Sequence, residues 1–166
     1  MRVDWPNCFL ILVLAGFIIP ECCTHAQDES EEDLSAVEAF QVINDIKVIA
    51  QKAALPSLTG DEKFVLREAW WGGTIEPGKA KLHQVQLFKR NNYKFWLAVP
   101  ELKAELNLNV YNSDGQLVPT EVDYIDHSNI ATTEMSPEVT GIYFIRVSLK
   151  TSIDNDQDYA VIYAYR

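Results

Sequence analysis

After Gly60 the chain becomes a succession of short runs in which apolar and polar residues alternate. In the clearest run Leu106, Leu108 and Val110 share one face, and Asn107 and Asn109 share the other. Alternation with a period of two is typical of a β-strand that is buried on one face. Such runs predict strands at residues 64–71, 81–88, 93–99, 106–111, 116–118, 129–133, 142–149 and 159–165. Because no helical segments intervene, βαβ units are excluded, and we expect an antiparallel β-sandwich or barrel.

Turn residues separate these runs. They include Gly72-Gly73, Pro77-Gly78, Arg90–Asn92, Asn112–Gly115 and Pro137–Gly141. Glycine, proline and asparagine adopt the backbone angles that tight turns require, so each cluster predicts a connection between two strands.

Residues Leu34 to Leu55 show helical spacing instead. The apolar side chains that recur every three or four residues are Ala36, Ala39, Phe40, Ile43, Ile46, Ala50 and Ala53. This spacing predicts one amphipathic helix, which Pro56 should end. A strand at 46–50 is the competing interpretation, but the alanine-rich flanks favour a helix. The apolar stripe needs a cover, which is either the sandwich or a partner protein.

The first 26 residues have the features of a secretory signal peptide. The apolar run Cys8–Ile19 is about 12 residues long, short of the roughly 20 that a membrane-spanning helix needs. Thr24-His25-Ala26 places small residues where signal peptidase cuts, so we expect cleavage after Ala26. An uncleaved anchor is the alternative. Lipidation at Cys22 or Cys23 is disfavoured because Glu21 stands where a small residue is needed.

The sequence therefore divides into a signal peptide at 1–26, an acidic start with a helix at 27–60, and a sandwich domain at 61–166. All three cysteines lie in the first segment, which excludes a disulfide framework and cysteine-ligated zinc in the rest. The net charge of −10 argues against nucleic acids and anionic membrane surfaces as partners. We expect a secreted or periplasmic protein that does not insert into a membrane once the leader is removed.

Five segments in order carry a resemblance to a known family. They are G-G-T-I-E-P-G at Gly72–Gly78, Gln86–Leu97, Leu106–Val118, V-T-G-I-Y-F-I-R-V at Val139–Val147, and D-Y-A-V-I at Asp158–Ile162. In this order they resemble the bacterial pre-peptidase C-terminal domain, a jelly-roll-like β-sandwich. The resemblance implies a non-catalytic appendage for secretion, solubility or substrate adhesion, with calcium-dependent collagen-binding modules among its relatives. The chain departs from that family because a helix, and no peptidase, precedes the domain.

The stretch S-I-D-N-D-Q-D-Y contains alternating acids at Asp154, Asp156 and Asp158. An EF-hand would require glycine at position 159 and a glutamate near the loop end, and both are missing. A looser calcium site remains open, because calcium needs only clustered oxygen ligands, and Asp114 is a further candidate ligand. The alternative is a solvated turn, in which aspartate and asparagine are common.

Aromatic side chains are the other candidate site. Trp70 and Trp71 should point to opposite sides of a strand, and Tyr163 and Tyr165 should share one side of the last strand as a small exposed patch. We expect Trp71, Tyr163 and Tyr165 to bind a ligand by stacking and apolar burial, and a place in the core is the alternative.

These features favour a non-enzymatic binding or accessory module that acts on protein or carbohydrate outside the cytoplasm. A periplasmic structural or assembly factor, which engages a partner through the helix or a sheet edge, is the first alternative. The second is a small hydrolase that uses His127 and nearby acids, although no catalytic motif is present.

Overall fold

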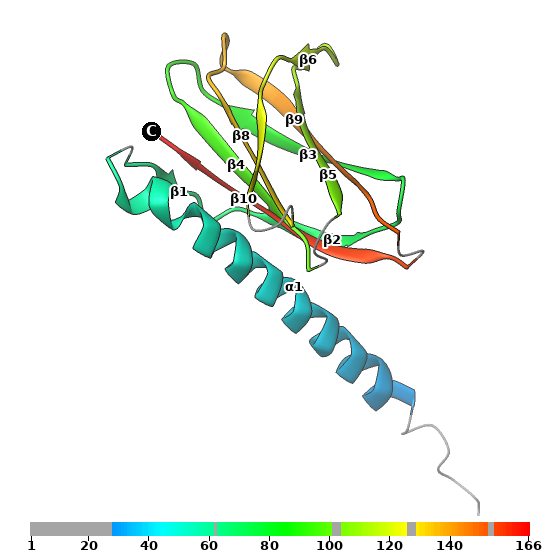
Figure 1. Cartoon of the computed structure of the whole chain (residues 1–166). Helices are drawn as coiled ribbons and strands as arrows, with labels where there is room; N and C mark the ends of the chain where they lie inside the picture. The colour runs from blue at the N-terminus through cyan, green and yellow to red at the C-terminus, as the bar shows by residue number, and fades with distance from the viewer. Residues whose placement is uncertain (1–27, 62, 101–103, 126–128, 153–154) are drawn as a thin grey trace, which may run out of the picture.

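The computed structural model of the whole chain describes residues 28–61, 63–100, 104–125, 129–152 and 155–166. In these residues one helix precedes ten strands (Figure 1). The elements are α1 (Asp28–Thr59), β1 (Val65–Leu66), β2 (Trp71–Ile75), β3 (Ala80–Leu87), β4 (Tyr93–Ala98), β5 (Glu105–Tyr111), β6 (Leu117–Val118), β7 (Val122–Ile125), β8 (Ile130–Met135), β9 (Gly141–Lys150) and β10 (Gln157–Tyr165). No helix in this described part is long and apolar enough to span a membrane. The expected signal peptide lies outside it.

The strands form two antiparallel sheets. The first has six strands in the order β1-β10-β4-β8-β7, with β2 also paired to β10. The second has four strands in the order β3-β9-β5-β6. The expected fold class is confirmed: the chain is mainly β, with two antiparallel sheets preceded by one N-terminal helix.

The main core lies between the two sheets. On β5 the buried side chains are Leu106, Leu108 and Val110, as their alternation predicts. The members contributed by β9 are Tyr143, Ile145, Val147 and Leu149. The six-stranded sheet contributes Phe95 and Leu97 from β4, and Tyr159, Val161 and Tyr163 from β10. Burial of this apolar surface is the main force that holds the two sheets together.

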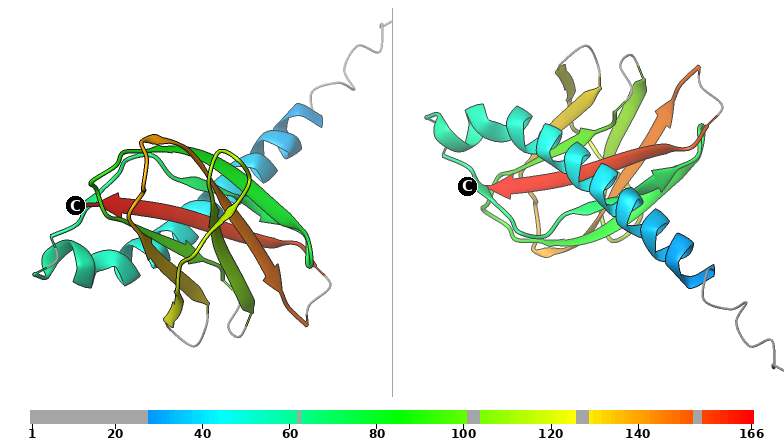
Figure 2. Two further views of the ribbon diagram at one scale, coloured as in Figure 1. Left: turned by 90° about the horizontal axis from the view of Figure 1, so that it is seen from above. Right: turned by 90° about the horizontal axis from the view of Figure 1, so that it is seen from below.

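A second core lies on the other side of the six-stranded sheet. Helix α1 crosses the outer face of that sheet (Figures 1 and 2). Ile46 and Ala50 of α1 are buried there against Trp96 of β4 and Ile162 of β10. Because β4 and β10 are covered on both faces, they read as almost continuous apolar runs. This half of α1 therefore packs on the sandwich.

The helix is longer than expected at both ends. It begins at Asp28 and continues past Pro56 to Thr59. Pro56 lies three residues from the end, so the one N–H that its ring removes is lost from the last turn and not from the helix interior. The Thr59 hydroxyl donates to the carbonyl of Leu55, and the Gly60 N–H donates to the carbonyl of Pro56.

Two further expectations are corrected. Gly72 and Gly73 lie inside β2 and pair with Ala160 and Tyr159 of β10, whereas a turn was expected there. The absence of a side chain serves close packing, since a Cβ on Gly72 would lie 2.6 Å from a methyl group of Ile43 in α1. The short strand β7 was not expected, because its half-exposed sequence V-D-Y-I has no clear alternation.

Candidate ligand-binding groove

The outer face of the four-stranded sheet is the candidate site, because α1 covers the other sheet and leaves this face open (Figure 2). The alternation that sends Tyr143 and Ile145 into the core sends Phe144 and Arg146 to the outside. Phe144 lies opposite Tyr111 on β5, and Arg146 lies opposite Leu82 on β3. Three strands thus place aromatic, aliphatic and cationic side chains next to one another.

These side chains line a groove of about 640 Å³. Its lining residues are Ala80, Lys81, Leu82, Tyr111, Ser113, Asp114, Gly115, Phe144 and Arg146. Leu82 is 59% exposed, which is unusual for a leucine in a strand interior. The guanidinium of Arg146 donates from Nη1 to the hydroxyl of Ser148 at 3.2 Å. A groove of this size, apolar with a few fixed polar groups, is the common form of a small-ligand site.

One wall of the groove is the turn between β5 and β6. The side-chain oxygen of Asn112 accepts hydrogen bonds from the backbone N–H of Asp114 at 3.0 Å and of Gln116 at 2.8 Å. Gly115 takes a φ of 76°, a left-handed angle that glycine adopts without strain. This bonding fixes the backbone of the turn and holds Asp114 at the rim.

A second cluster of rings fills the edge of the sandwich between β2, β10 and β3. The indole of Trp71 stacks on the imidazole of His83 at 5.4 Å between centroids and on the Tyr163 ring at 5.3 Å. The Tyr163 ring also stacks on Phe95 at 5.6 Å. Nε2 of His83 and the hydroxyl of Tyr159 share a hydrogen bond of 2.9 Å. These contacts join the two sheets at their open edge.

Burial changes the acid–base properties of this cluster. Desolvation lowers the pKa of His83, and the positive charge of Lys81 lowers it further. Desolvation also raises the pKa of the Tyr159 hydroxyl. Both shifts favour the neutral forms, so His83 and Tyr159 form a neutral hydrogen-bonded pair at pH 7. Such a pair stabilises the edge.

A smaller hollow of about 180 Å³ opens beside this cluster. Tyr93, Tyr163 and Tyr165 line it together with Arg67. The Arg67 guanidinium lies 5.5 Å from the centroid of the Tyr165 ring. The hydroxyl of Tyr163, followed by that of Tyr165, raises the pKa of Arg67 above its ordinary value. The hollow is therefore cationic at any physiological pH.

The structure places the three predicted aromatic residues close together but not as expected. Trp71 stacks on Tyr163, and Tyr165 lies at the end of the same strand. Tyr163 is only 6% exposed, so the expected exposed patch on Tyr163 and Tyr165 is wrong for Tyr163. The reason is that Tyr163 faces the other sheet and completes the ring stack. Trp70 and Trp71 do lie on opposite sides, with Trp70 under α1.

The predicted acidic residues do not all meet. Asp154 lies outside the described residues. Asp156 precedes β10, and Asp158 at its start accepts a hydrogen bond of 2.8 Å from the hydroxyl of Thr74. Asp114 follows the far end of β5, whereas the chain before Asp156 leaves β9 beside the first residue of β5. About 20 Å of strand separates them, so Asp114 does not join that group.

Within the described residues no group of three or more His, Cys, Asp and Glu side chains is placed to hold a metal. A calcium site at Asp156 and Asp158 stays a prediction, and comparing thermal melts with calcium and with a chelator tests it. His127 also lies outside the described residues.

Sequence reasoning missed Phe144 and Arg146. It used the alternation of β9 to find the buried residues Tyr143, Ile145, Val147 and Leu149, and the same alternation defines an outward set. An aromatic and a cationic residue at outward positions of a central strand were the available signal.

Comparison with known proteins adds little to this picture. No protein-family model matches the chain, and no curated protein matches it. The structure is distantly similar to PliG from Aeromonas hydrophila, a periplasmic inhibitor of g-type lysozyme, with 10% identity and a TM-score of 0.41 over 59% of this chain and 85% of that chain. It is also similar to the Bacillus licheniformis lipase BlEst2 in its propeptide form, with 12% identity and a TM-score of 0.41 over 69% of this chain and 26% of the lipase. Similarity at this level carries no functional argument, and the resemblance to the pre-peptidase C-terminal family stays a prediction.

Proposed function

We propose that this chain is an exported, non-catalytic binding module that holds a protein or carbohydrate ligand on the outer face of its four-stranded sheet. The observation that carries the proposal is the groove of about 640 Å³ on the sheet face that α1 leaves open. Export rests on the predicted signal peptide at residues 1–26.

The chemistry of the groove suits an extended polymer. The rings of Tyr111 and Phe144 and the side chain of Leu82 offer apolar surface to a sugar ring or a peptide side chain. Arg146 and Asp114 offer hydrogen bonds of opposite polarity at its border. The groove is built mainly on strands, which hold these groups more rigidly than loops do.

The absence of catalysis is part of the proposal. His83 is the one histidine in the described part of the chain. It shares a hydrogen bond with Tyr159 and stacks on Trp71, and we assign it a structural role. Hydrolysis of p-nitrophenyl acetate that disappears in a His127→Ala variant would contradict this part.

Binding is tested by electrophoresis of the purified protein through gels that contain soluble polysaccharides, and by incubation on arrays of short peptides. A retarded band or a reproducible peptide signal should weaken in Phe144→Ala and in Tyr111→Ala. Each loss should be about tenfold in affinity, the size expected for an aromatic anchor.

Val139→Ala is the matched control, since Val139 is 62% exposed and lies outside the groove. Binding that survives both aromatic substitutions would place the site elsewhere. Failure of every probe to bind would count against the proposed ligand classes.

A further inference from the structure

The first part of α1 has no cover from the sandwich. Every residue from Ser35 to Val42 is exposed, whereas Ile46, Ala50 and Ala54 further along are buried. Figure 1 shows this part of the helix extending past the edge of the sheets. A helical segment without tertiary packing is only marginally stable in water, so another surface is needed to support it.

A second apolar stripe runs along the side of α1 that faces away from the sandwich. Val37, Phe40, Val48 and Leu55 are 67%, 62%, 43% and 51% exposed. Val37, Val48 and Leu55 are separated by eleven and seven residues, so they lie on one side of the helix, with Phe40 at its border. Asn44 follows Val37 by seven residues and therefore lies on the same side of the helix.

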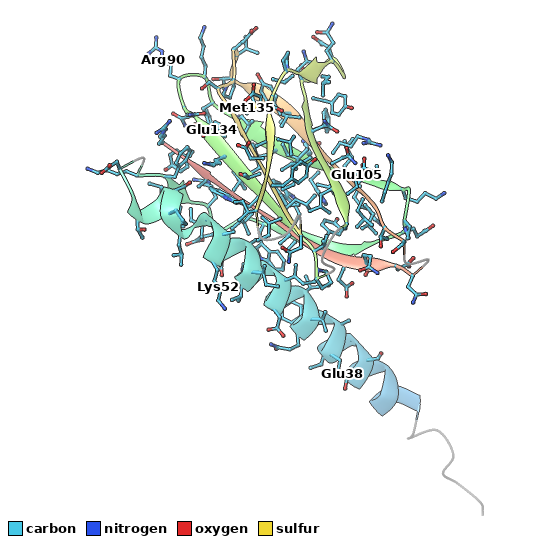
Figure 3. The ribbon with its side chains drawn as sticks, viewed as in Figure 1. Glu38, Lys52, Arg90, Glu105, Glu134 and Met135 are labelled. Atoms are coloured by element: carbon cyan, nitrogen blue, oxygen red, sulfur yellow. The ribbon has the colours of Figure 1, made fainter. Side chains whose placement is uncertain are left out.

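Charges on the helix select the partner. Glu38 and Lys52 lie on one flank of the stripe, and both point away from the sandwich (Figure 3). The sequence at the start of α1, D-E-S-E-E-D, is strongly acidic, whereas Lys47 and Lys52 lie in its second half. In a parallel pair the acidic starts would face each other, whereas in an antiparallel pair they lie at opposite ends and Glu38 comes near Lys52.

We propose that two copies of this chain associate through their α1 helices, antiparallel, along the stripe of Val37, Phe40, Val48 and Leu55. The pairing sets Val37 of each copy beside Leu55 of the other. The same register brings Glu38 of one copy to within about one helical turn of Lys52 of the other, on facing flanks. The contact is isologous, so each favourable pair occurs twice.

Sedimentation velocity of the purified protein over a range of concentrations measures the association. The expected result is a reversible dimer that becomes monomeric in Phe40→Glu/Val48→Glu. Val139→Glu is the control, since Val139 is 62% exposed and lies on the sandwich. Circular dichroism shows whether each variant still folds. A protein that is monomeric at every concentration, or a dimer that Phe40→Glu/Val48→Glu leaves intact, would overturn the proposal.

Charge reversal tests the partner more closely. Glu38→Lys and Lys52→Glu alone should each raise the dimer dissociation constant about two- to tenfold, because each removes two exposed ion pairs. The double variant should recover most of the original affinity, since its opposite charges again face each other. A double variant that is weaker than both single variants would contradict this pairing.

Engineered cysteines separate the two orientations. In a background with Cys8, Cys22 and Cys23 replaced by serine, Val37→Cys/Leu55→Cys should form a covalent dimer on mild oxidation. Val37→Cys alone should not, because the two sites of an antiparallel pair lie about 27 Å apart along the helices. Efficient cross-linking of Val37→Cys alone would show a parallel pair and overturn the antiparallel arrangement.

Discussion

Replacing Gly72 with alanine should destabilise the protein, because α1 approaches β2 too closely there for a β-carbon. A Cβ at this position would lie 2.6 Å from Cγ2 of Ile43, 2.6 Å from Cζ3 of Trp70 and 3.2 Å from the carbonyl oxygen of Tyr159. Relief requires α1 to lift from the sheet or the Trp70 ring to turn. The ring is itself held by Lys47, whose Nζ lies 4.4 Å from its centroid.

The expected magnitude follows from two opposing effects. Inserting one methyl group into a packed interface costs about 1–3 kcal/mol of unfolding free energy. Alanine also reduces the entropy of the unfolded chain, which stabilises the fold by about 0.4–1 kcal/mol. The net loss should be about 1–2 kcal/mol, which lowers Tm by about 3–6 °C for a chain of this length.

Urea denaturation followed by tryptophan fluorescence measures the loss, since Trp70 lies at the affected contact. Gly141→Ala is the matched control, because a Cβ there meets nothing within 4 Å and the free energy of unfolding should be unchanged or slightly higher. Ile43→Ala combined with Gly72→Ala should recover part of the loss, as expected for two residues in contact. If Gly72→Ala behaves like Gly141→Ala, the helix does not pack against β2 and the reasoning is refuted.

Three further outcomes are expected. Ile46→Ala should lower the unfolding free energy by about 2–4 kcal/mol in urea titrations, because it removes a buried side chain. The control Lys52→Ala, at an exposed position of the same helix, should lower it by less than about 0.5 kcal/mol. Equal losses in the two variants would show that α1 does not pack on the sheet. The pKa of His83 is lowered in the folded state from its ordinary value of 6.5. Below pH 6.5 the unfolded chain therefore binds more protons at this residue than the folded chain does. Stability should therefore fall as the pH drops through about 6.5, and His83→Gln should weaken this dependence when urea midpoints are compared above and below that pH. The hydroxyl of Thr132 is buried and has no hydrogen-bond partner among the described residues. Thr132→Val should consequently keep or raise the melting temperature, and a clear drop in a thermal scan would reveal a bond that this hydroxyl makes.

The sequence predicted the sandwich because its strands are amphipathic. Leu106, Leu108 and Val110 could be assigned to the core from alternation alone, since one face of β5 meets the other sheet. The turn predicted at Gly72-Gly73 is wrong, because glycines that suit a turn also suit a close contact between a helix and a strand. A local sequence cannot distinguish these uses, since the deciding neighbour, Ile43, belongs to another element.

The helix shows a similar limit. Its spacing predicted an apolar stripe from Ala36 to Ala53, but the sandwich covers that stripe only from about Ile43 onward. How many turns are covered depends on the width of the six-stranded sheet, which the helix sequence does not contain. The candidate groove was missed for a related reason. Phe144 and Arg146 become neighbours of Tyr111 and Leu82 only through strand pairing across three distant segments.

The two proposals fit together geometrically. Helix α1 lies on the six-stranded sheet (Figure 2), and the groove residues lie on the far face of the other sheet, so association through α1 would leave both grooves uncovered. A dimer would then present two ligand sites. If the ligand is a polymer or a surface with repeated sites, two linked grooves retain it longer than one, without any new contact in either groove. A monomeric Phe40→Glu/Val48→Glu variant should consequently bind short ligands as tightly as the native protein does, but bind polymeric ligands more weakly. A substitution in the groove itself would weaken the binding of both kinds of ligand.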